Sequence, residues 1–396
     1  MMLRVFFYLL VFCVIVPATA FSQQAKNIAD TLQQLRQIKI ELDHETEVPA
    51  AAIPLLTRLK HNLLALFQQV LNEGGPGVQA AAARKELRRR LQAAGVGVTA
   101  IDWDNVPEGY GVIFNLDVSQ PAGHSDLLVF RSQVSSECGE DSSIYVFQKR
   151  KTRWDRVIAV ESTGYQQVDG ALGNLQYQVS PPDADGHWFL VYAHQYPWCV
   201  GNWNTIEYRA LRPGASPEKP VVVLSRKQGM YRGPVYHDDE WPKLEATRDT
   251  FRLDFDASQK LDAGVLVRTH IDRYRIAGNQ ATRIPPLADS AAGFLDAWAH
   301  MPRHEAAQWS RMTKFPRAGH HMLGSTGLYH EFDFVQPCPG GNKWQIGVNV
   351  GESGPNGPLQ RLVATVVKEG EGYFVTQLGY KRPGGCPGTR QAWGDE

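Results

Sequence analysis

Residues 126–147, DLLVFRSQVSSECGEDSSIYVF, and residues 188–209, WFLVYAHQYPWCVGNWNTIEYR, are two copies of one pattern. The copies are related by a constant shift of 190 − 128 = 62 residues, and the cysteine alone slips by one position. The matched positions are Leu128, Val129, Phe130, Gln133, Gly139 and Ile144 in the first copy and Leu190, Val191, Tyr192, Gln195, Gly201 and Ile206 in the second. A repeat at this spacing predicts a supersecondary unit whose apolar face is covered by a neighbouring copy.

The repeat extends beyond the quoted stretch. Residues 114–119 (FNLDVS) match residues 175–180 (LQYQVS) at a shift of 175 − 114 = 61. A fainter third copy, without the cysteine and the glycine, begins at residues 251–255 (FRLDF) and continues to residue 276. Within a copy, apolar runs alternate with Gly, Pro, Asp and Ser, which predicts short strands joined by turns. We therefore expect a repeated four-stranded antiparallel meander, arranged as propeller-like blades or as stacked sheets closed by helices.

Helical periodicity precedes the repeats. Apolar residues recur at helical spacing through residues 25–94, and Pro49, Pro54 and the glycine-rich residues 72–77 interrupt the pattern. These interruptions predict three helices. The helices form a small segment that either packs on the β region or serves as an interaction surface.

Helices and strands also follow the repeats. Asp289 and Ser290 are expected to cap a helix that runs to Ala299, and Pro302 is expected to open a second helix. Four runs with strand-like alternation come next, at residues 328–335, 344–350, 362–367 and 373–378. The predicted fold class is therefore mainly β with helical additions and a small C-terminal α+β unit. The expected domains are a signal peptide (1–20), a helical segment (21–97), a repeated β domain (98–286) and the C-terminal domain (287–396).

The N-terminus has the features of a signal peptide. Arg4 precedes an apolar stretch at residues 5–16, and Pro17 and the small residues 18–20 follow. The apolar stretch has about twelve residues, fewer than the roughly twenty that cross a bilayer, so an uncleaved anchor is the weaker alternative. A lipoprotein is weaker still, because apolar residues surround Cys13. We expect an exported protein, periplasmic or extracellular, with no integral membrane segment after cleavage.

Cleavage removes Cys13 and leaves Cys138, Cys199, Cys338 and Cys386. An even number of cysteines in an exported protein predicts two disulfides, for which three pairings are possible. We favour Cys138 with Cys199, because equivalent positions of stacked repeats lie close together, and Cys338 with Cys386. Each pair closes a loop of about fifty to sixty residues and should contribute on the order of 4 kcal/mol. Free thiols in a reducing compartment are the alternative.

The charges of the chain are balanced, with 41 Lys plus Arg and 41 Asp plus Glu. No long run of either sign occurs, so electrostatics give no argument for a nucleic acid or an anionic membrane as partner. The one basic cluster, residues 84–90, lies in a predicted helix and is interpreted as a solvated helix face.

The densest titratable cluster is His237, Asp238, Asp239 and Glu240, between the second and third copies. A histidine beside carboxylates can act as a general base or bind a metal. His237 with Asp238 or Asp239 is therefore the candidate catalytic group. Because neighbouring side chains cannot all face one point, a solvated acidic loop is the alternative.

A second histidine cluster begins like a zinc-protease helix. His304 and Glu305 fit that motif, but Gln308 stands where the second histidine ligand is required. A capped amphipathic helix is therefore the preferred interpretation.

A third cluster is the weak candidate for a metal site. His320 and His321 follow Gly319 in a predicted loop, and Glu331 lies on a predicted strand shortly afterwards. One of the histidines with Glu331 forms a possible ligand set. Surface histidines beside a turn are the alternative, and no metal is predicted.

The second copy is rich in aromatic residues. Trp198 and Trp203 have no aromatic counterpart in the first copy, whereas Tyr192 aligns with Phe130. Exposed rings are surfaces on which sugars or peptides stack. Tyr196, Trp198 and Trp203 are therefore the predicted ligand-binding residues, and burial of these rings in the core is the alternative.

The sequence contains no serine nucleophile elbow, phosphate loop, dinucleotide glycine fingerprint or spaced-aspartate calcium loop. No cofactor is predicted. The leading hypothesis is an exported, non-catalytic binding or envelope-associated protein that contacts a protein or carbohydrate surface through its aromatic residues. The alternative is a secreted hydrolase that uses His237 with a neighbouring carboxylate, with or without a metal. A purely structural role is a third hypothesis.

Overall fold

The computed structural model describes residues 18–38, 48–98, 109–136, 139–162, 173–195, 203–231, 242–261, 264–325, 328–352 and 359–387. Its strands form four antiparallel sheets, each with four strands in sequence order. Sheet A contains β1 (Ile113–Ser119), β2 (Leu127–Ser136), β3 (Gly139–Lys149) and β4 (Trp154–Glu161), and sheet B contains β5 (Gly173–Val179), β6 (Leu190–Gln195), β7 (Trp203–Ser216) and β8 (Lys219–Tyr231). Sheet C contains β9 (Lys243–Ala246), β10 (Thr250–Leu261), β11 (Gly264–Ala277) and β12 (Gln280–Arg283), and sheet D contains β13 (Leu328–Pro337), β14 (Lys343–Glu352), β15 (Gln360–Glu369) and β16 (Gly372–Gly379). The predicted fold class is confirmed.

Sheets A, B and C correspond to the three copies of the sequence repeat. The matched Leu128 and Leu190 lie in β2 and β6, the second strands of sheets A and B. The alignment of the third copy is wrong by one strand. The sequence pattern places the start of this copy at residues 251–255, but these residues lie in β10, the second strand of sheet C, because the short strand β9 precedes them. Sheet D has the same strand order and no counterpart in the repeat.

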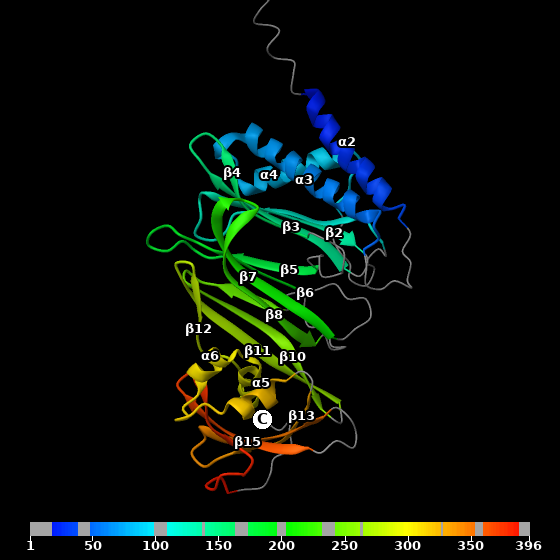
Figure 1. Cartoon of the computed structure of the whole chain (residues 1–396). Helices are drawn as coiled ribbons and strands as arrows, with labels where there is room; N and C mark the ends of the chain where they lie inside the picture. The colour runs from blue at the N-terminus through cyan, green and yellow to red at the C-terminus, as the bar shows by residue number, and fades with distance from the viewer. Residues whose placement is uncertain are drawn as a thin grey trace, which may run out of the picture. The chain divides into compact units, whose positions relative to one another are not determined.

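Three helices cover one face of sheet A: α2 (Ala18–Leu35), α3 (Ala52–Gly74) and α4 (Ala80–Ala93), with the short 3-10 helix η1 (Gly75–Gly77) between the last two (Figure 1). Phe67 of α3 stacks on Phe130 with ring centroids 4.6 Å apart, and it meets Phe147 edge-on at 5.2 Å. The apolar stripe of α3 thus supplies the contact with the sheet. The prediction of three N-terminal helices is confirmed.

The other face of sheet A packs on sheet B. Successive residues of a strand point to opposite faces. Accordingly, Tyr145 and Phe147 of β3 join the cluster under the helices, whereas Ile144 and Val146 join a second cluster with Leu190 of sheet B. Both faces of sheet A are therefore buried.

Helix α4 lies along the edge of sheet A and protects it. Arg84 Nη1 lies 2.9 Å from Asp117 Oδ1, and Arg88 Nη2 donates to the carbonyl of Leu116 at 3.1 Å. Both acceptors belong to the edge strand β1. The basic cluster at residues 84–90 is therefore partly a contact surface and not simply a solvated helix face.

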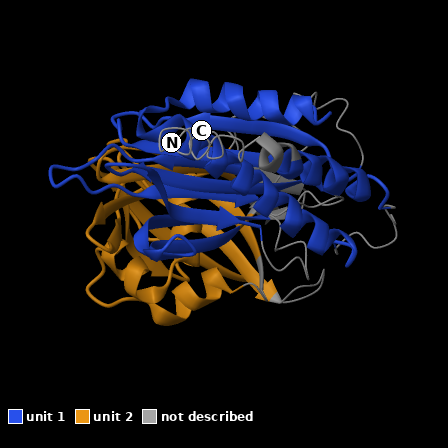
Figure 2. Cartoon of the chain, turned by 90° about the horizontal axis from the view of Figure 1, so that it is seen from above, with its two compact units in different colours: residues 1–228 blue, residues 229–396 orange. Residues whose placement is uncertain are grey.

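The chain divides into two compact units, residues 1–228 (unit 1) and residues 229–396 (unit 2), shown in blue and orange in Figure 2. Sheet A and sheet B, apart from the last three residues of β8, belong to unit 1, and sheets C and D belong to unit 2. This division follows packing, whereas the domain boundaries predicted after residues 97 and 286 followed secondary structure. Those boundaries stay a prediction.

Unit 2 places a helical layer on sheet D. The helices are α5 (Ala291–His300), α6 (Arg303–Ala306), the 3-10 helix η4 (Ala307–Trp309) and α7 (Arg317–Gly324). α5 contacts β11 of sheet C and also β15 and β16 of sheet D. Ser290 caps α5 as predicted, because its Oγ accepts a hydrogen bond from the Gly293 amide at 3.1 Å. Trp298, fully buried in this layer, donates from Nε1 to the carbonyl of Ala306 at 2.9 Å.

A buried ionic cluster joins sheet C to α6. Arg283 of β12 binds the fully buried Asp272 of β11 and lies 3.3 Å from Glu305 Oε1. His270 Nε2 lies 3.4 Å from Asp272 Oδ1. Glu305, which resembled the glutamate of a zinc-protease helix, is thus a partner of Arg283 in the interior of unit 2.

The outer face of sheet D carries a row of hydrogen-bonding side chains. One residue from each strand contributes, and each lies opposite the next in register: Gln336, Gln345, Thr365 and Gln377. We call this set the amide row. Gln345 is fully buried and Thr365 is 1% exposed. Thr365 Oγ1 donates to Gln377 Oε1 at 3.3 Å.

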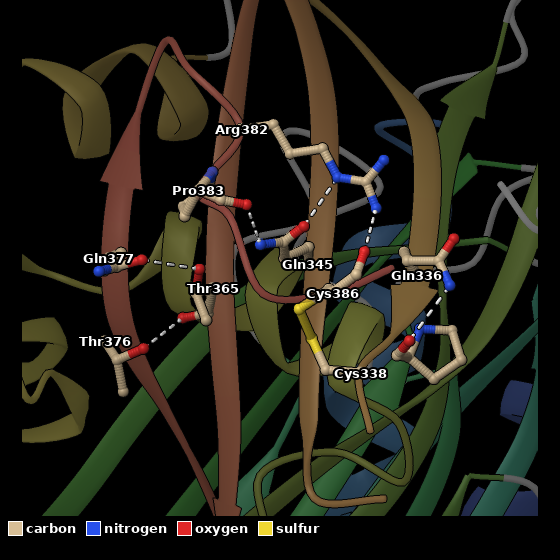
Figure 3. The surroundings of a disulfide bond; sticks show 10 residues. Gln336, Cys338, Gln345, Thr365, Thr376, Gln377, Arg382, Pro383 and Cys386 are labelled. Carbon is tan, nitrogen blue, oxygen red and sulfur yellow. Dashed lines mark hydrogen bonds between the residues drawn. A yellow bond between two sulfur atoms is a disulfide. The ribbon is translucent and has the colours of Figure 1, made fainter. Parts of the chain in front are cut away.

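The C-terminal segment, residues 380–387, folds back over the amide row, and we call it the strap (Figure 3). Gln345 Nε2 donates to the carbonyl of Pro383 at 2.7 Å, and Arg382 Nε donates to Gln345 Oε1 at 2.8 Å. A disulfide joins Cys386 of the strap to Cys338, as predicted from the sequence.

The disulfide decides whether the strap is ordered. Six of its eight residues are exposed, and Cys386 alone is buried. Two side-chain hydrogen bonds with Gln345 contribute about 1 kcal/mol each, and the long bond from Tyr380 to Met322 Sδ contributes less. Ordering each residue costs about 1–2 kcal/mol. The noncovalent contacts are therefore too weak to hold eight residues without the covalent link.

Candidate functional site at the polar end of sheets A and B

One end of sheets A and B is lined by polar side chains. β2, β4 and β6 end here and β3, β5 and β7 begin here, so the connections 137–138, 163–172 and 196–202 attach at this end. Its buried polar residues are Ser132, Gln133, Ser135, Ser136, Glu140, Asp141, Ser142, Ser143, Ser162, His194 and Gln195. We call this region of unit 1 the polar end.

A buried ion pair lies on the helix side of the polar end. Lys60 of α3 is 3% exposed, and its Nζ lies 3.4 Å from Oδ2 of Asp141, which is 1% exposed. The same ammonium donates a hydrogen bond to the carbonyl of Ser162, the residue that follows β4. A buried pair of this kind fixes geometry, since loss of either partner leaves an uncompensated charge. It ties α3 to the ends of β3 and β4.

Two side chains on the opposite face of sheet A clamp the first strand of sheet B. Glu140 Oε1 accepts hydrogen bonds from the Leu175 amide and from the Ser142 hydroxyl, both at 3.0 Å. The guanidinium of Arg131 donates to the Leu175 carbonyl. The N–H and C=O of one residue in the edge strand β5 are thus both bound by side chains of sheet A. Burial raises the pKa of Glu140, against the opposing effect of Arg131.

Sheet B contributes a buried histidine to the same end. His194 of β6 is 2% exposed and lies opposite Glu207 of β7 in register, with Nε2 and Oε2 3.8 Å apart. Its ring stacks near Tyr192 at a centroid distance of 6.3 Å. Glu207 Oε1 also accepts a hydrogen bond from Arg209 Nε at 2.6 Å. Glu207 therefore lies beside both His194 and Arg209.

The charged groups of the polar end are engaged in contacts that hold the strand ends. A buried carboxyl with a raised pKa is a group that can transfer protons. However, Glu140 is 4% exposed, and one of its oxygens already binds the amide of Leu175 and the hydroxyl of Ser142. Lys60 is held against Asp141 in the same way. The polar end therefore fixes the strand ends from which the connecting loops start.

The predicted ligand-binding residues belong to these connections. Tyr196 and Trp198 lie in residues 196–202, outside the described residues, and Trp203 is the first residue of β7, with a side chain that is likewise outside them. Cys138 and Cys199 also lie outside the described residues. Their ligand-binding role and their pairing stay predictions.

The predicted catalytic candidates lie elsewhere in the sequence. His237, Asp238 and Asp239 belong to residues 232–241, outside the described residues. The hydrolase hypothesis therefore stays a prediction.

The predicted metal candidates lie on two elements of unit 2, helix α7 and strand β13. His320 and His321 lie in helix α7, not in a loop, so that interpretation of the sequence is wrong. His320 is buried, its Nε2 lies 3.1 Å from the carbonyl oxygen of Trp298, and its ring meets the Trp298 ring edge-on at 4.7 Å. Burial lowers the pKa of His320. Glu331 lies in β13, opposite Asn349.

Within the described ranges, the group of metal-capable side chains that lie within 4.8 Å of one another is Asp183, Asp185 and His187. All three belong to the turn between β5 and β6. Asp183 Oδ1 accepts hydrogen bonds from the His187 amide at 2.8 Å and from the Asp185 amide at 3.0 Å, and these bonds lower the pKa of Asp183. Such bonds are typical of an Asx turn and explain why the side chains gather.

Sequence reasoning missed the polar end, although a signal was present. The run at residues 135–143, SSECGEDSS, is polar where β2 ends and β3 begins, and these two strands bury both faces. Polar residues at positions where alternation predicts core are a mark of a special site. Lys60, by contrast, could not be found this way, because it lies on a helix rich in leucine and its partner Asp141 is distant in the sequence.

No protein-family model and no curated protein matches this sequence. Among solved structures, 22 chains match. One is the alpha-L-arabinofuranosidase from Fusarium graminearum in complex with an iminosugar inhibitor, with 9% identity, a TM-score of 0.26, and coverage of 66% of this chain and 66% of that chain. The enzyme of the same species with arabinobiose gives the same values.

Another matching structure is an Ntf2-like protein involved in plasmid conjugation, with 10% identity, a TM-score of 0.17, and coverage of 81% of this chain and 97% of that chain. TM-scores of 0.26 and 0.17 do not establish a shared fold or a shared activity.

Proposed function

We propose that this chain is an exported, non-catalytic binding protein that contacts its partner with the loops at the polar end of unit 1. The observation that carries the proposal is the clamp on Leu175, in which Glu140 and Arg131 bind both backbone groups of an edge strand. Binding residues in proteins lie typically on loops that a rigid scaffold positions. The clamp and the Lys60–Asp141 pair supply such a scaffold at the end where the connections attach.

The aromatic residues of the second copy give the proposed surface its chemistry. Tyr196 and Trp198 belong to the connection between β6 and β7, and Trp203 opens β7. Aromatic side chains supply large contact areas at a low cost in conformational entropy and dominate many interfaces. The proposed partner is accordingly a protein or a carbohydrate surface.

Export is part of the proposal and rests on two observations. The N-terminus has the order of a signal peptide, and the chain contains the Cys338–Cys386 disulfide, a bond typical of oxidising compartments. None of the described helices combines the length and apolar character that crossing a membrane requires.

The test is retention of the full chain on insoluble polysaccharides, purified cell-envelope fractions and an immobilised peptide panel. Trp198→Ala and Trp203→Ala should each reduce retention on whichever support binds the wild type, by about tenfold if they are central to the interface. Tyr380→Ala is the matched control, because Tyr380 is 60% exposed and belongs to unit 2. Unchanged retention in both tryptophan variants contradicts the proposal. So does hydrolysis of an ester, glycoside or peptide substrate that disappears in His237→Ala.

A further inference from the structure

The strap covers a face of sheet D that is chemically unusual for a permanently buried surface. Its centre is the amide row, in which Gln345 is fully buried and Gln336 is 5% exposed. Gln336 Oε1 has no hydrogen-bond partner within the part of the chain that the structure describes. Burying an unpaired amide oxygen is unfavourable unless water or another group can reach it in some state of the protein.

The apolar part of this face is small. Phe334 lies against Gly347, where an added Cβ would be 2.4 Å from the ring, and the Arg382 guanidinium lies over the ring at 5.1 Å. Val363 stands opposite Gly347 on the next strand. If the strap lifts, water can satisfy the amide row, and little apolar surface is exposed. Such a face suits a cover that opens and closes.

The strap itself is held by one strong link. Gln345 forms hydrogen bonds with Arg382 and Pro383 of the strap (Figure 3). The other noncovalent contacts of the strap with the rest of the described chain are the Arg382 guanidinium over the Phe334 ring and a long hydrogen bond from the Tyr380 hydroxyl to Met322 Sδ at 3.8 Å. Most of its residues are exposed, so it buries little surface that would keep it in place. The Cys338–Cys386 bond therefore determines whether the strap is ordered on sheet D or free.

We propose that the Cys338–Cys386 disulfide is a lock, and that its reduction by a dithiol releases the strap and uncovers the amide row. The step is thiol–disulfide exchange. The bond between the two cysteine sulfurs breaks, and each sulfur gains one electron and one proton from the dithiol. The two sulfurs of the dithiol join in a new disulfide, so atoms and electrons balance.

Hydroxyl-radical footprinting of the full chain tests this lock. Phe334 and Phe332 belong to the same strand and are 4% and 6% exposed. The strand has an irregularity of register between them, and they lie on opposite faces, since Phe332 joins the cluster under the helices and Phe334 lies beneath Arg382. After treatment with dithiothreitol, labelling of Phe334 should rise several-fold, whereas labelling of Phe332 should stay unchanged. Trypsin cleavage after Lys381 should accelerate in parallel, since a free strap is a better substrate than a tethered one.

Cys338→Ser separates this disulfide from any effect of the reductant on Cys138 and Cys199. The variant should show the high labelling of Phe334 without reductant, and dithiothreitol should not raise it further. Unchanged labelling of both rings after reduction would show that the strap stays in place, and the proposal would be wrong. Increased labelling of both rings would show that the disulfide holds the whole of unit 2 together, which also overturns it.

Discussion

Sheets A and D are alike on one face, which helices cover, and differ on the other face. Each follows three described α-helices in the sequence, and each buries an apolar face beneath those helices. The second face of sheet A is apolar and packs on sheet B, whereas the second face of sheet D carries the amide row beneath the strap. The chemistry of the second face therefore decides which kind of layer covers a four-stranded sheet. An apolar face requires another permanent layer, while a polar face can be left to a short tethered segment.

The helix-covered faces also differ in one respect. Under α3, sheet A holds the Lys60–Asp141 pair. Under α5, sheet D is packed by Trp298, a fully buried ring whose Nε1 donates to the carbonyl of Ala306. The helix-covered face of sheet A therefore combines a buried charge pair with the aromatic contacts of Phe67.

The largest expected effect comes from breaking that buried charge pair. Lys60→Met should lower the free energy of unfolding of unit 1 by about 3–5 kcal/mol, because it removes the buried ammonium that lies beside the buried Asp141 carboxylate. Chemical denaturation measures the loss. The double variant Lys60→Met with Asp141→Leu should recover much of it, because no charge is then left unpaired. A single variant as stable as the wild type would contradict the importance of the pair.

The second faces of the two sheets should differ in their sensitivity to truncation. Leu190→Ala, at the interface of sheets A and B, should cost about 2–5 kcal/mol through lost burial and a cavity. Gln345→Ala, in the amide row, should cost only about 1–3 kcal/mol, since it removes two hydrogen bonds and frees their partners to bind water. Denaturant titrations of both variants compare the losses. Equal costs would remove the distinction between the two faces.

The pH dependence of the stability of unit 1 should reveal the contribution of Glu140. Because burial raises its pKa above the ordinary value of 4.5, the stability that this group contributes is full below pH 4.5 and is lost as the pH rises through the folded-state pKa. Glu140→Gln should therefore flatten the decline in thermal stability above pH 4.5. Glu86→Gln is the control. Hydrogen bonds from Arg89 lower the pKa of Glu86 to about 2, so its contribution is lost only as the pH falls from 4.5 toward 2.

Unit 2 should respond to pH with the opposite sign, and this is the smallest effect that we expect. Burial lowers the pKa of His320 below the ordinary value of 6.5, so the stability due to this group is full above pH 6.5 and is lost as the pH falls through the folded-state pKa. Thermal melts of wild type and His320→Gln between pH 7 and 5 measure the difference. His321→Gln, at an exposed position of the same helix, should behave like the wild type.

Several features of this protein are determined by local sequence patterns. The repeat predicts the four-stranded meanders, because alternation and turn residues act over a few positions. Ser290 predicts the cap of α5, since a cap needs only the next turn of backbone. The even number of cysteines that remains after cleavage of the signal peptide predicts two disulfides. Because the repeat favours pairing Cys138 with Cys199, Cys338 and Cys386 are left to form the disulfide that the structure contains. Even so, the third copy was misaligned, because the short strand β9 leaves only a weak signal.

The tertiary structure alone decided the features that carry the proposals. Lys60 meets Asp141, and Glu140 meets the backbone of Leu175, only because the helices and sheet B pack on opposite faces of one sheet. The amide row exists only because four strands align in register. Within its own strand, the sequence pattern gives each member the character of an ordinary surface residue. Local patterns fix the elements because their interactions span a few residues. Burial, the pairing of charges and the covering of a sheet face depend on which distant segments of the chain meet. Short-range sequence patterns do not specify these long-range contacts.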